Sequence, residues 1–209
     1  MSLEQIYNDV VNGEMAEVEA GVTAALAEGL AAERILQDGL IAAMDRVGKL
    51  FEEGEIFVPE MLFAARAMQA GLKVLKPALA ASDVKSAGKV AIGTAQGDLH
   101  DIGKNLVIMM LEGAGFEVVD LGTDAPPERF VEAARGGAQV IGMSALLTTT
   151  MAAMGRTMEA LQAAGVRERV KVVIGGAPVT DAYAQKIGAD AYAADASVAT
   201  RIVRQLIAA

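Results

Sequence analysis

Apolar residues in the first part of the chain form four stripes, each at the spacing of an amphipathic helix. A polar, glycine-containing break at residues 52–55 precedes the last stripe, and Pro59 then suits the first turn of a helix. Pro77 predicts the end of that helix or a kink in it. The pattern predicts a bundle of four short helices, with stripes at Leu3–Val10, Met15–Leu26, Leu36–Phe51 and Met61–Leu75.

Near residue 85 the pattern changes to short β-rich runs that alternate with helical stretches. This alternation is typical of a parallel sheet with helices on both faces, and five strands indicate a flavodoxin-like (Rossmann-type) domain. We therefore expect an α/β chain with a helical domain at 1–85, an α/β domain at 86–209 and a protease-accessible junction at 80–88. The expected strands are 89–94, 116–120, 140–144, 170–174 and 191–193, and the expected helices are 101–113, 127–135, 150–164, 180–187 and 197–207.

Composition excludes several kinds of site. The 209 residues are 53% apolar and include no cysteine, so the chain is not disordered and has no disulfide, thiolate metal site or cysteine nucleophile. The single histidine, His100, excludes a metal site with two histidines of this chain. We expect a cytoplasmic protein, because cysteine is absent and neither a signal peptide nor a membrane-spanning run is visible.

Charge is unevenly distributed along the chain. The net charge is −9, and residues 1–85, with 7 basic and 14 acidic residues, account for −7 of it. An acidic chain does not favour binding to nucleic acid or to anionic lipid. We interpret the acidic part as a solvated surface, with a docking surface for a basic partner as the alternative.

The segment after the first predicted strand is the most informative. Ligands of α/β sheets bind outside the carboxyl ends of the strands, and His100 falls at such an end, although a lone histidine is more often a capping or surface residue. Asp98 is close enough to orient an imidazole, and Gly97 and Gly103 leave room for a bulky ligand. Two further strand ends allow close approach, with an ordinary turn as the alternative for the paired glycines: Ser144-Ala-Leu146 followed by Thr148, and Gly175-Gly176.

These motifs resemble a known family. Asp98-x-His100-x-x-Gly103, Ser144-x-Leu146 and Gly175-Gly176 look like the cobalamin-binding signature of methionine synthase, the corrinoid methyl-carrier proteins and the base-off mutases. Residues 44–61, MDRVGKLFEEGEIFVPEM, resemble the helical cap of methionine synthase and the corrinoid proteins, which the mutases lack. The chain is most similar to the small corrinoid proteins of methanol, methylamine and methoxy-compound methyltransferase systems.

The resemblance implies a cobalamin cofactor, methylcobalamin or a related corrinoid, bound base-off with His100 as the lower cobalt ligand. Asp98 would accept the other ring N–H of His100, and Ser144 would extend this hydrogen-bonded chain. The upper face of the corrinoid would lie near Phe57 and Met61, for which a place in the bundle core is the alternative. The other implied cofactor contacts are Gly97, Leu99, Asp101 and Gly103 around the histidine, and Ser144, Leu146, Thr148, Gly175, Gly176 and Ala196 along the nucleotide tail.

A substitution follows from the implied tail slot. Large side chains would not fit beside a buried tail, so Gly176→Leu is expected to weaken cofactor binding. Overpacking an empty slot should cost little, so the fold of the apoprotein is expected to stay largely intact.

The implied function is that of a methyl carrier. It would take a methyl group from a substrate-specific methyltransferase and pass it to a second methyltransferase, which methylates a thiol or tetrahydrofolate, while a reductive activase maintains the cobalt. We expect a non-autonomous subunit rather than a complete enzyme. One alternative is a cobalamin-dependent sensor, which would normally add a DNA-binding module. A receiver-like signalling domain would need a phosphorylatable aspartate where the third strand ends in Ser144.

Overall fold

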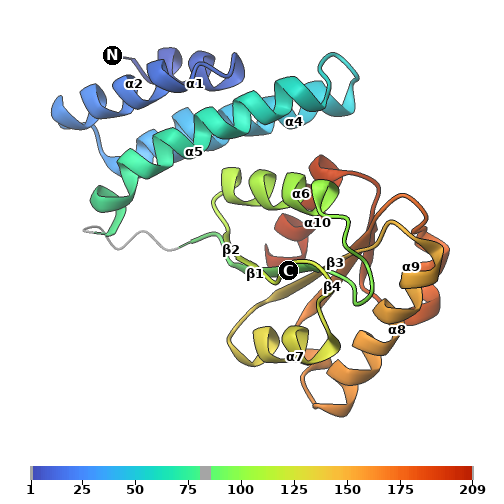
Figure 1. The fold of residues 1–209 in the computed structure, drawn as a ribbon. Coiled ribbons are helices and arrows are strands. Elements are labelled where there is room, and N and C mark those ends of the chain that lie inside the picture. The colour runs from blue at the N-terminus through green and yellow to red at the C-terminus, as the bar shows by residue number, and fades with distance from the viewer. Residues whose placement is uncertain (1, 81–85, 209) are drawn as a thin grey trace. The chain divides into compact units, whose positions relative to one another are not determined.

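The computed structural model describes residues 2–80 and 86–208. Its contacts divide the chain into two compact units, Met1–Lys85 with Glu112–Gly115 and Ser86–Leu111 with Phe116–Ala209. We call them the helical unit and the sheet unit and describe each by itself (Figure 1). Of the junction predicted to be protease-accessible, residues 81–85 lie outside the described residues.

The helical unit has the predicted four-helix pattern. Its helices are α1 (Leu3–Val11), α2 (Met15–Ala27), a continuous run of α3 (Ala32–Arg34), the π-helical η1 (Ile35–Ile41) and α4 (Ala42–Glu52), and α5 (Val58–Ala80). Ser2 caps α1 by accepting the Gln5 N–H at 3.1 Å. Helix α2 packs along α5, and α1 packs against α2, η1 and α4 (Figure 1). These contacts bury the predicted apolar stripes, including Ile6, Val18, Val22, Leu40, Met68 and Leu75.

Pro77 was predicted to end this helix or to kink it, and the first of these alternatives is wrong, because α5 continues to Ala80. Proline has no N–H, so α5 lacks the bond that residue 77 would otherwise donate to the Lys73 carbonyl, and the helix continues past this gap.

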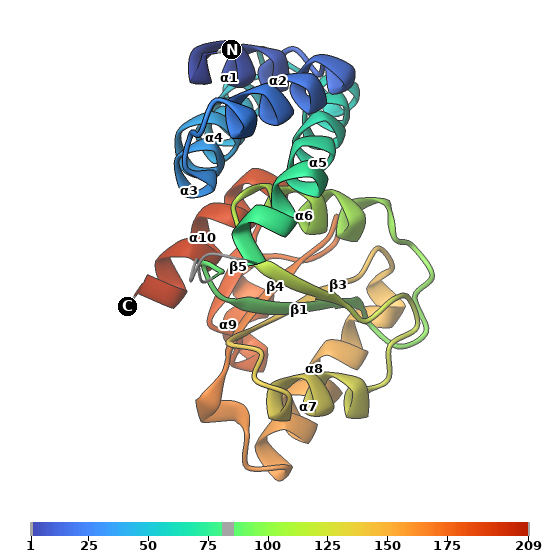
Figure 2. The same cartoon turned by 90° about the vertical axis from the view of Figure 1, so that its left-hand side faces the viewer.

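The sheet unit is a five-stranded parallel sheet in the order β2-β1-β3-β4-β5, which confirms the flavodoxin-like prediction. Its strands are β1 (Lys89–Thr94), β2 (Glu117–Asp120), β3 (Val140–Ser144), β4 (Lys171–Gly175) and β5 (Ala191–Ala193). Helices α6 (Ile102–Gly113) and α10 (Ala196–Ala208) cover one face, and α7 (Pro127–Arg135), α8 (Thr148–Ala163) and α9 (Asp181–Ile187) cover the other (Figure 2). A short 3-10 helix, η2 (Arg167–Arg169), precedes β4.

Strand register aligns the candidate residues at one edge of the sheet. Thr94 of β1 pairs with Ser144 of β3, Ser144 with Gly175 of β4, and Gly175 with Ala193 of β5. The loops that follow these strands therefore emerge side by side at the carboxyl edge, where ligands of parallel sheets bind. The five strands and the five α-helices of this unit begin and end within two residues of their predicted bounds, and η2 was not predicted.

Within the described residues, no helix combines the length and the hydropathy needed to cross a lipid bilayer.

Candidate functional site

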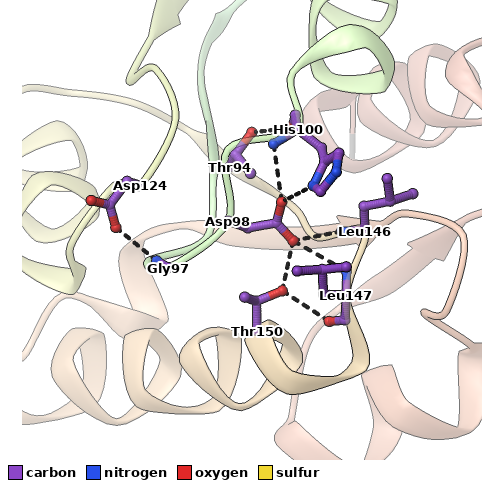
Figure 3. Close-up of polar contacts among 8 residues, drawn as sticks. All are labelled: Thr94, Gly97, Asp98, His100, Asp124, Leu146, Leu147 and Thr150. Atoms are coloured by element: carbon purple, nitrogen blue, oxygen red, sulfur yellow. Dashed lines mark hydrogen bonds and ion pairs between the residues drawn. The ribbon is translucent and has the colours of Figure 1, made fainter.

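The loop between β1 and α6 begins with a tight turn. The Asp98 N–H donates to the Ala95 carbonyl at 3.0 Å, and Gly97, the third residue of the turn, has a φ of +88°. This is the φ that a type II turn requires at its third position and that glycine adopts without strain. The turn directs the Asp98 side chain inward, where it is 0% exposed (Figure 3).

Donors from two loops surround the Asp98 carboxylate. Its Oδ1 accepts the backbone N–H of His100 at 3.0 Å and lies 2.7 Å from the ring Nδ1 of His100. Its Oδ2 accepts the Leu146 N–H at 2.8 Å, the Leu147 N–H at 3.2 Å and the Thr150 hydroxyl at 2.6 Å (Figure 3). Both oxygens of this buried group are therefore satisfied, as a buried charge requires.

This environment keeps Asp98 ionised. Burial alone would raise the pKa of Asp98, but the hydrogen bonds from Thr150, His100 and Leu146 outweigh it and hold that pKa well below its ordinary range. Thr150 lies in the first turn of α8, and the positive end of a helix dipole also favours an anion. Asp98 is thus a fixed negative charge beneath His100.

His100 presents one free ring nitrogen to the surface. Its side chain is half exposed, and an ionised carboxylate can only accept, so the ring proton lies on Nδ1. The lone pair of a neutral ring is then on Nε2, away from Asp98 (Figure 3). The pair has the arrangement of a metal-ligating histidine whose second nitrogen is held by a carboxylate.

Exposed apolar side chains lie close to His100 in the sequence and in the segment whose N–H groups bind Asp98. The four large apolar side chains that are most exposed among the described residues of the sheet unit are Leu99, Ile102, Leu146 and Leu147, at 71%, 75%, 44% and 44%. All four belong to the segments that flank His100 or bind Asp98. A Cβ added at Gly103 would meet no atom within 4 Å, so the chain itself does not require glycine there. Asp101 is also exposed. An apolar surface around a polar anchor is typical of a ligand site.

The relay role that the resemblance implies for Ser144 needs correction. Among the described residues, the side-chain hydroxyl that reaches Asp98 is that of Thr150, six residues further along the chain. Ser144 ends β3, and its carbonyl accepts the Ala95 N–H at 2.9 Å in the sheet. The chain returns over Asp98 only at Leu146, Leu147 and the first turn of α8. In the sequence, Thr150 was visible only as the last of three consecutive threonines, at the first position of the predicted helix 150–164.

The paired glycines are required by the chain itself. Gly176 has a φ of +124°, and a Cβ added there would lie 1.9 Å from the Ala145 carbonyl oxygen. A Cβ at Gly175 would lie 2.9 Å from the Ala193 carbonyl oxygen. The expectation that Gly176→Leu leaves the apoprotein intact is therefore wrong, because the added side chain would displace the β3–α8 loop.

The remaining predicted contacts of the sheet unit lie near the carboxyl edge. Thr148 is exposed at the start of α8. Ala196 is 6% exposed and begins α10, where the preceding Asp195 accepts the Val198 N–H at 2.8 Å as a helix cap. The structure thus leaves Thr148 accessible and buries Ala196 at a helix start.

An ion pair between a buried lysine and an exposed aspartate, which was not predicted, anchors α6 next to the site. Lys104 is 2% exposed, and its Nζ donates to Asp120 Oδ1 and to Asn105 Oδ1, each at 2.7 Å. Burial would raise the pKa of Asp120, but Lys104 and the Gly122 N–H lower it below its ordinary value. The pair ties the first turn of α6, directly after His100, to the end of β2. A lysine inside an otherwise apolar helix pattern was its only signal in the sequence.

The two upper-face candidates of the helical unit differ in exposure. Phe57, just before α5, is 68% exposed. Met61 is 1% exposed and belongs to the buried core, which agrees with the alternative considered for it. Of the two, only Phe57 presents its side chain to solvent.

Comparison with known proteins identifies the family. A B12 binding domain model matches residues 88–201, and a second B12 binding domain model matches residues 2–76. Dimethylamine corrinoid protein 1 of Methanosarcina mazei is 49% identical over 175 residues, covering 83% of this chain and 81% of that protein. Dimethylamine corrinoid protein 2 of Methanosarcina acetivorans is 44% identical over 207 residues, covering 98% and 95%.

A solved structure matches in fold as well. The crystal structure of the methanol:cobalamin methyltransferase complex MtaBC from Methanosarcina barkeri contains a chain that aligns with a TM-score of 0.89 and 31% identity. The alignment covers 99% of this chain and 79% of that one. The predicted resemblance is thereby confirmed over both units.

Proposed function

Because the chain belongs to the B12-binding family of corrinoid proteins, we propose that it is the methyl-carrying corrinoid subunit of a methylamine methyltransferase system and that His100 is its lower axial ligand. The observation that carries the ligand assignment is the half-exposed imidazole, whose Nδ1 lies 2.7 Å from the fully buried carboxylate of Asp98. Identities of 49% and 44% to two dimethylamine corrinoid proteins, and of 46% and 48% to two trimethylamine corrinoid proteins, support a methylamine as the source of the methyl group.

The site fits a corrinoid in its chemistry. The corrin ring supplies four equatorial nitrogens, so a protein can coordinate its metal only along the axis, and the chain offers one imidazole for that position. Leu99, Ile102, Leu146 and Leu147 offer the apolar surface that a macrocycle would cover. When bound, the corrinoid supplies the cobalt that accepts and gives up the methyl group.

The residues of the chain control the basicity of the axial nitrogen. The ionised Asp98 holds the Nδ1 proton, which leaves Nε2 as the donor atom and makes it a stronger donor. The hydrogen bonds from Thr150 and the Leu146 and Leu147 N–H groups keep Asp98 ionised. If Nε2 leaves the axial position, it can take up a proton.

We assign the rest of the cofactor to the carboxyl edge of the sheet unit, with the cofactor bound base-off. Residues 86–209 would hold the corrinoid, and its nucleotide tail would pass the row of strand ends. Residues 1–85 would cap the upper face, with Phe57 as the candidate contact. Opening of such a cap would admit a methyltransferase, as lids do in other enzymes. The tail contacts we propose are Ser144, Leu146, Thr148, Gly175, Gly176 and Ala196.

The partners follow from the role of carrier. A substrate-specific methyltransferase would load the chain, and a second methyltransferase would unload it to an acceptor thiol or tetrahydrofolate. A reductive activase would restore cobalt that has been oxidised. The chain would then turn over as a subunit of the system.

Reconstitution with partners tests this function. The purified chain is loaded with a corrinoid, reduced, and mixed either with a dimethylamine methyltransferase of Methanosarcina and dimethylamine or with a methanol-specific methyltransferase and methanol. We expect methylation of the corrinoid, followed by its absorption spectrum, with dimethylamine and not with methanol. Methylation with methanol and a methanol-specific partner instead would reject the methylamine assignment while leaving the carrier role.

A further inference from the structure

Asp124, in the loop between β2 and α7, differs from the other described residues in its backbone. Its φ is +49°, and it is the one non-glycine residue within 2–80 and 86–208 with a positive φ. Aspartate and asparagine tolerate this region better than other residues with a Cβ, but the conformation still has a cost. Such a conformation persists where surrounding contacts hold it in place.

Those contacts join Asp124 to the turn that carries Asp98. Asp124 Oδ1 accepts the Gly97 N–H at 2.7 Å (Figure 3). The Asp124 N–H donates to the Asp98 carbonyl at 2.9 Å. The Gly97 N–H is not used by the turn itself, whose closing bond runs from the Asp98 N–H to Ala95. One residue therefore holds the peptide groups on both sides of the Gly97–Asp98 bond.

The neighbouring backbone supports the same attachment. The Ala125 N–H donates to the Thr94 carbonyl at 2.9 Å, and Ala95 forms a parallel bridge with Ala125. These bonds place Asp124 against the turn, but they do not fix the peptide between Gln96 and Gly97, whose N–H is that of Gly97. The carboxylate of Asp124 supplies the acceptor for that peptide.

We propose that Asp124 is a positioning residue for the axial ligand, an inference that rests on His100 being that ligand. Asp98 is held from the inner side by Leu146, Leu147 and Thr150, and Asp124 holds its backbone from the outer side. With the outer hold removed, the Gln96–Gly97 peptide can rotate, and the backbone that leads into Asp98 can move with it. Asp98 Oδ1 then no longer faces Nδ1 of His100, and the direction in which Nε2 points is no longer fixed.

Three substitutions separate the acceptor from the backbone conformation. Asp124→Asn keeps both an acceptor oxygen and tolerance of positive φ. Asp124→Gly keeps the φ without strain but removes the acceptor. Asp124→Ala removes both. A role of the side chain predicts that the asparagine variant behaves as the wild type and that glycine and alanine variants share the defect.

Asp190 provides a matched control at the opposite edge of the sheet. It precedes β5, and its Oδ2 accepts the Val172 N–H and an Arg167 N–H, each at 2.7 Å. Asp190→Ala therefore removes a carboxylate that also holds a backbone N–H, and it should lower stability without reaching His100. The Asp190→Ala variant therefore shows how the measurements below respond when stability falls but the surroundings of His100 do not change.

The first measurement uses the apoprotein and the single histidine. With nitrogen-15 histidine, the ring shifts of His100 at alkaline pH should report a proton on Nδ1 in the wild type, Asp124→Asn and Asp190→Ala. The glycine and alanine variants should shift toward the mixture of tautomers of an unrestrained ring. Unchanged ring shifts in Asp124→Gly would overturn the proposal, because the side chain of Asp124 would then not act on His100.

The second measurement uses the protein loaded with a cobalt(II) corrinoid. The share of the EPR signal split by the His100 nitrogen should fall in the glycine and alanine variants, and corrinoid affinity should fall about tenfold, as for other residues that orient a metal ligand. Full splitting and wild-type affinity in both variants would also overturn the proposal. If the wild type itself lacks histidine splitting, the axial-ligand assignment fails instead, while the tautomer measurement still tests Asp124.

Discussion

The loop after β1 and the loop after β4 both carry glycines at the carboxyl edge of the sheet, but their surroundings differ. Gly176 lies against the backbone of Ala145, so its missing side chain makes room for the chain itself. Gly103, at the start of α6, faces open space beside a half-exposed imidazole. A glycine in a motif can thus make room for the protein or for a ligand, and only the contacts of the folded chain separate the two.

The largest effect on stability is expected when a side chain is added at Gly176. Gly176→Leu should lower the free energy of unfolding of the apoprotein by about 3–5 kcal/mol, because the side chain meets the Ala145 carbonyl and the φ of +124° is strained for leucine. Gly137→Leu is the control, since its φ is +90° but no atom lies within 4 Å of its added Cβ. Equal losses in urea unfolding of the two variants would show that the contact with Ala145 does not matter.

The second largest loss of stability is expected when the buried charge of Asp98 is removed. Asp98→Asn should cost about 3 kcal/mol near neutral pH, because an amide cannot accept all the donors around it. The lowered pKa of Asp98 stabilises the fold above its unfolded pKa of about 4, and this contribution is lost as the pH falls toward the folded pKa. The difference in unfolding free energy between wild type and variant should therefore narrow below about pH 4. A gap that stays constant down to acid pH would contradict an ionised Asp98.

A smaller loss of stability is expected at Thr150, and almost none at Ser144. Thr150→Val should cost about 1.5 kcal/mol, because it leaves Asp98 without one hydrogen bond, and Thr150→Ser should restore most of it. Ser144→Ala should change the unfolding free energy by less than about 0.5 kcal/mol. Urea unfolding of the apoproteins measures all three. A larger loss for Ser144→Ala than for Thr150→Val would restore the original assignment of the relay.

The smallest effect on stability has the opposite sign. Gly103→Ala should raise the free energy of unfolding of the apoprotein by about 0.5–1 kcal/mol, because alanine favours the helix and the added methyl meets nothing. The same methyl should weaken corrinoid binding if the macrocycle approaches α6 there. A titration with cobalamin, followed by absorbance, measures this. A variant that is more stable and binds equally well would remove Gly103 from the site.

Features that depend on the local pattern of residues could be predicted from the sequence. Helical and strand periodicity located the elements of the sheet unit within two residues, and chain direction then placed His100 at the carboxyl edge. The pairing of Asp98 with His100 was also predictable, because two residues in one short loop have few ways to lie apart.

The residues whose roles were missed or wrongly predicted depend on contacts between segments that are distant in the sequence. Thr150 reaches Asp98 only because of the path that the chain takes after β3, and periodicity does not specify that path. The approach of Ala145 to Gly176 and the attachment of Asp124 to Gly97 likewise join segments that are distant in the sequence. Lys104 was missed because its partner, Asp120, ends a different strand.

The assignment of His100 as the axial ligand is tested most directly by EPR of the cobalt(II) corrinoid form. An axial nitrogen splits the cobalt lines into triplets, and labelling the single histidine of the chain with nitrogen-15 labels one imidazole. If His100 is the ligand, labelling turns each triplet into a doublet, and His100→Ala removes the protein-derived splitting. A triplet that labelling leaves unchanged would show that the cofactor's own base holds the cobalt, and it would contradict the assignment.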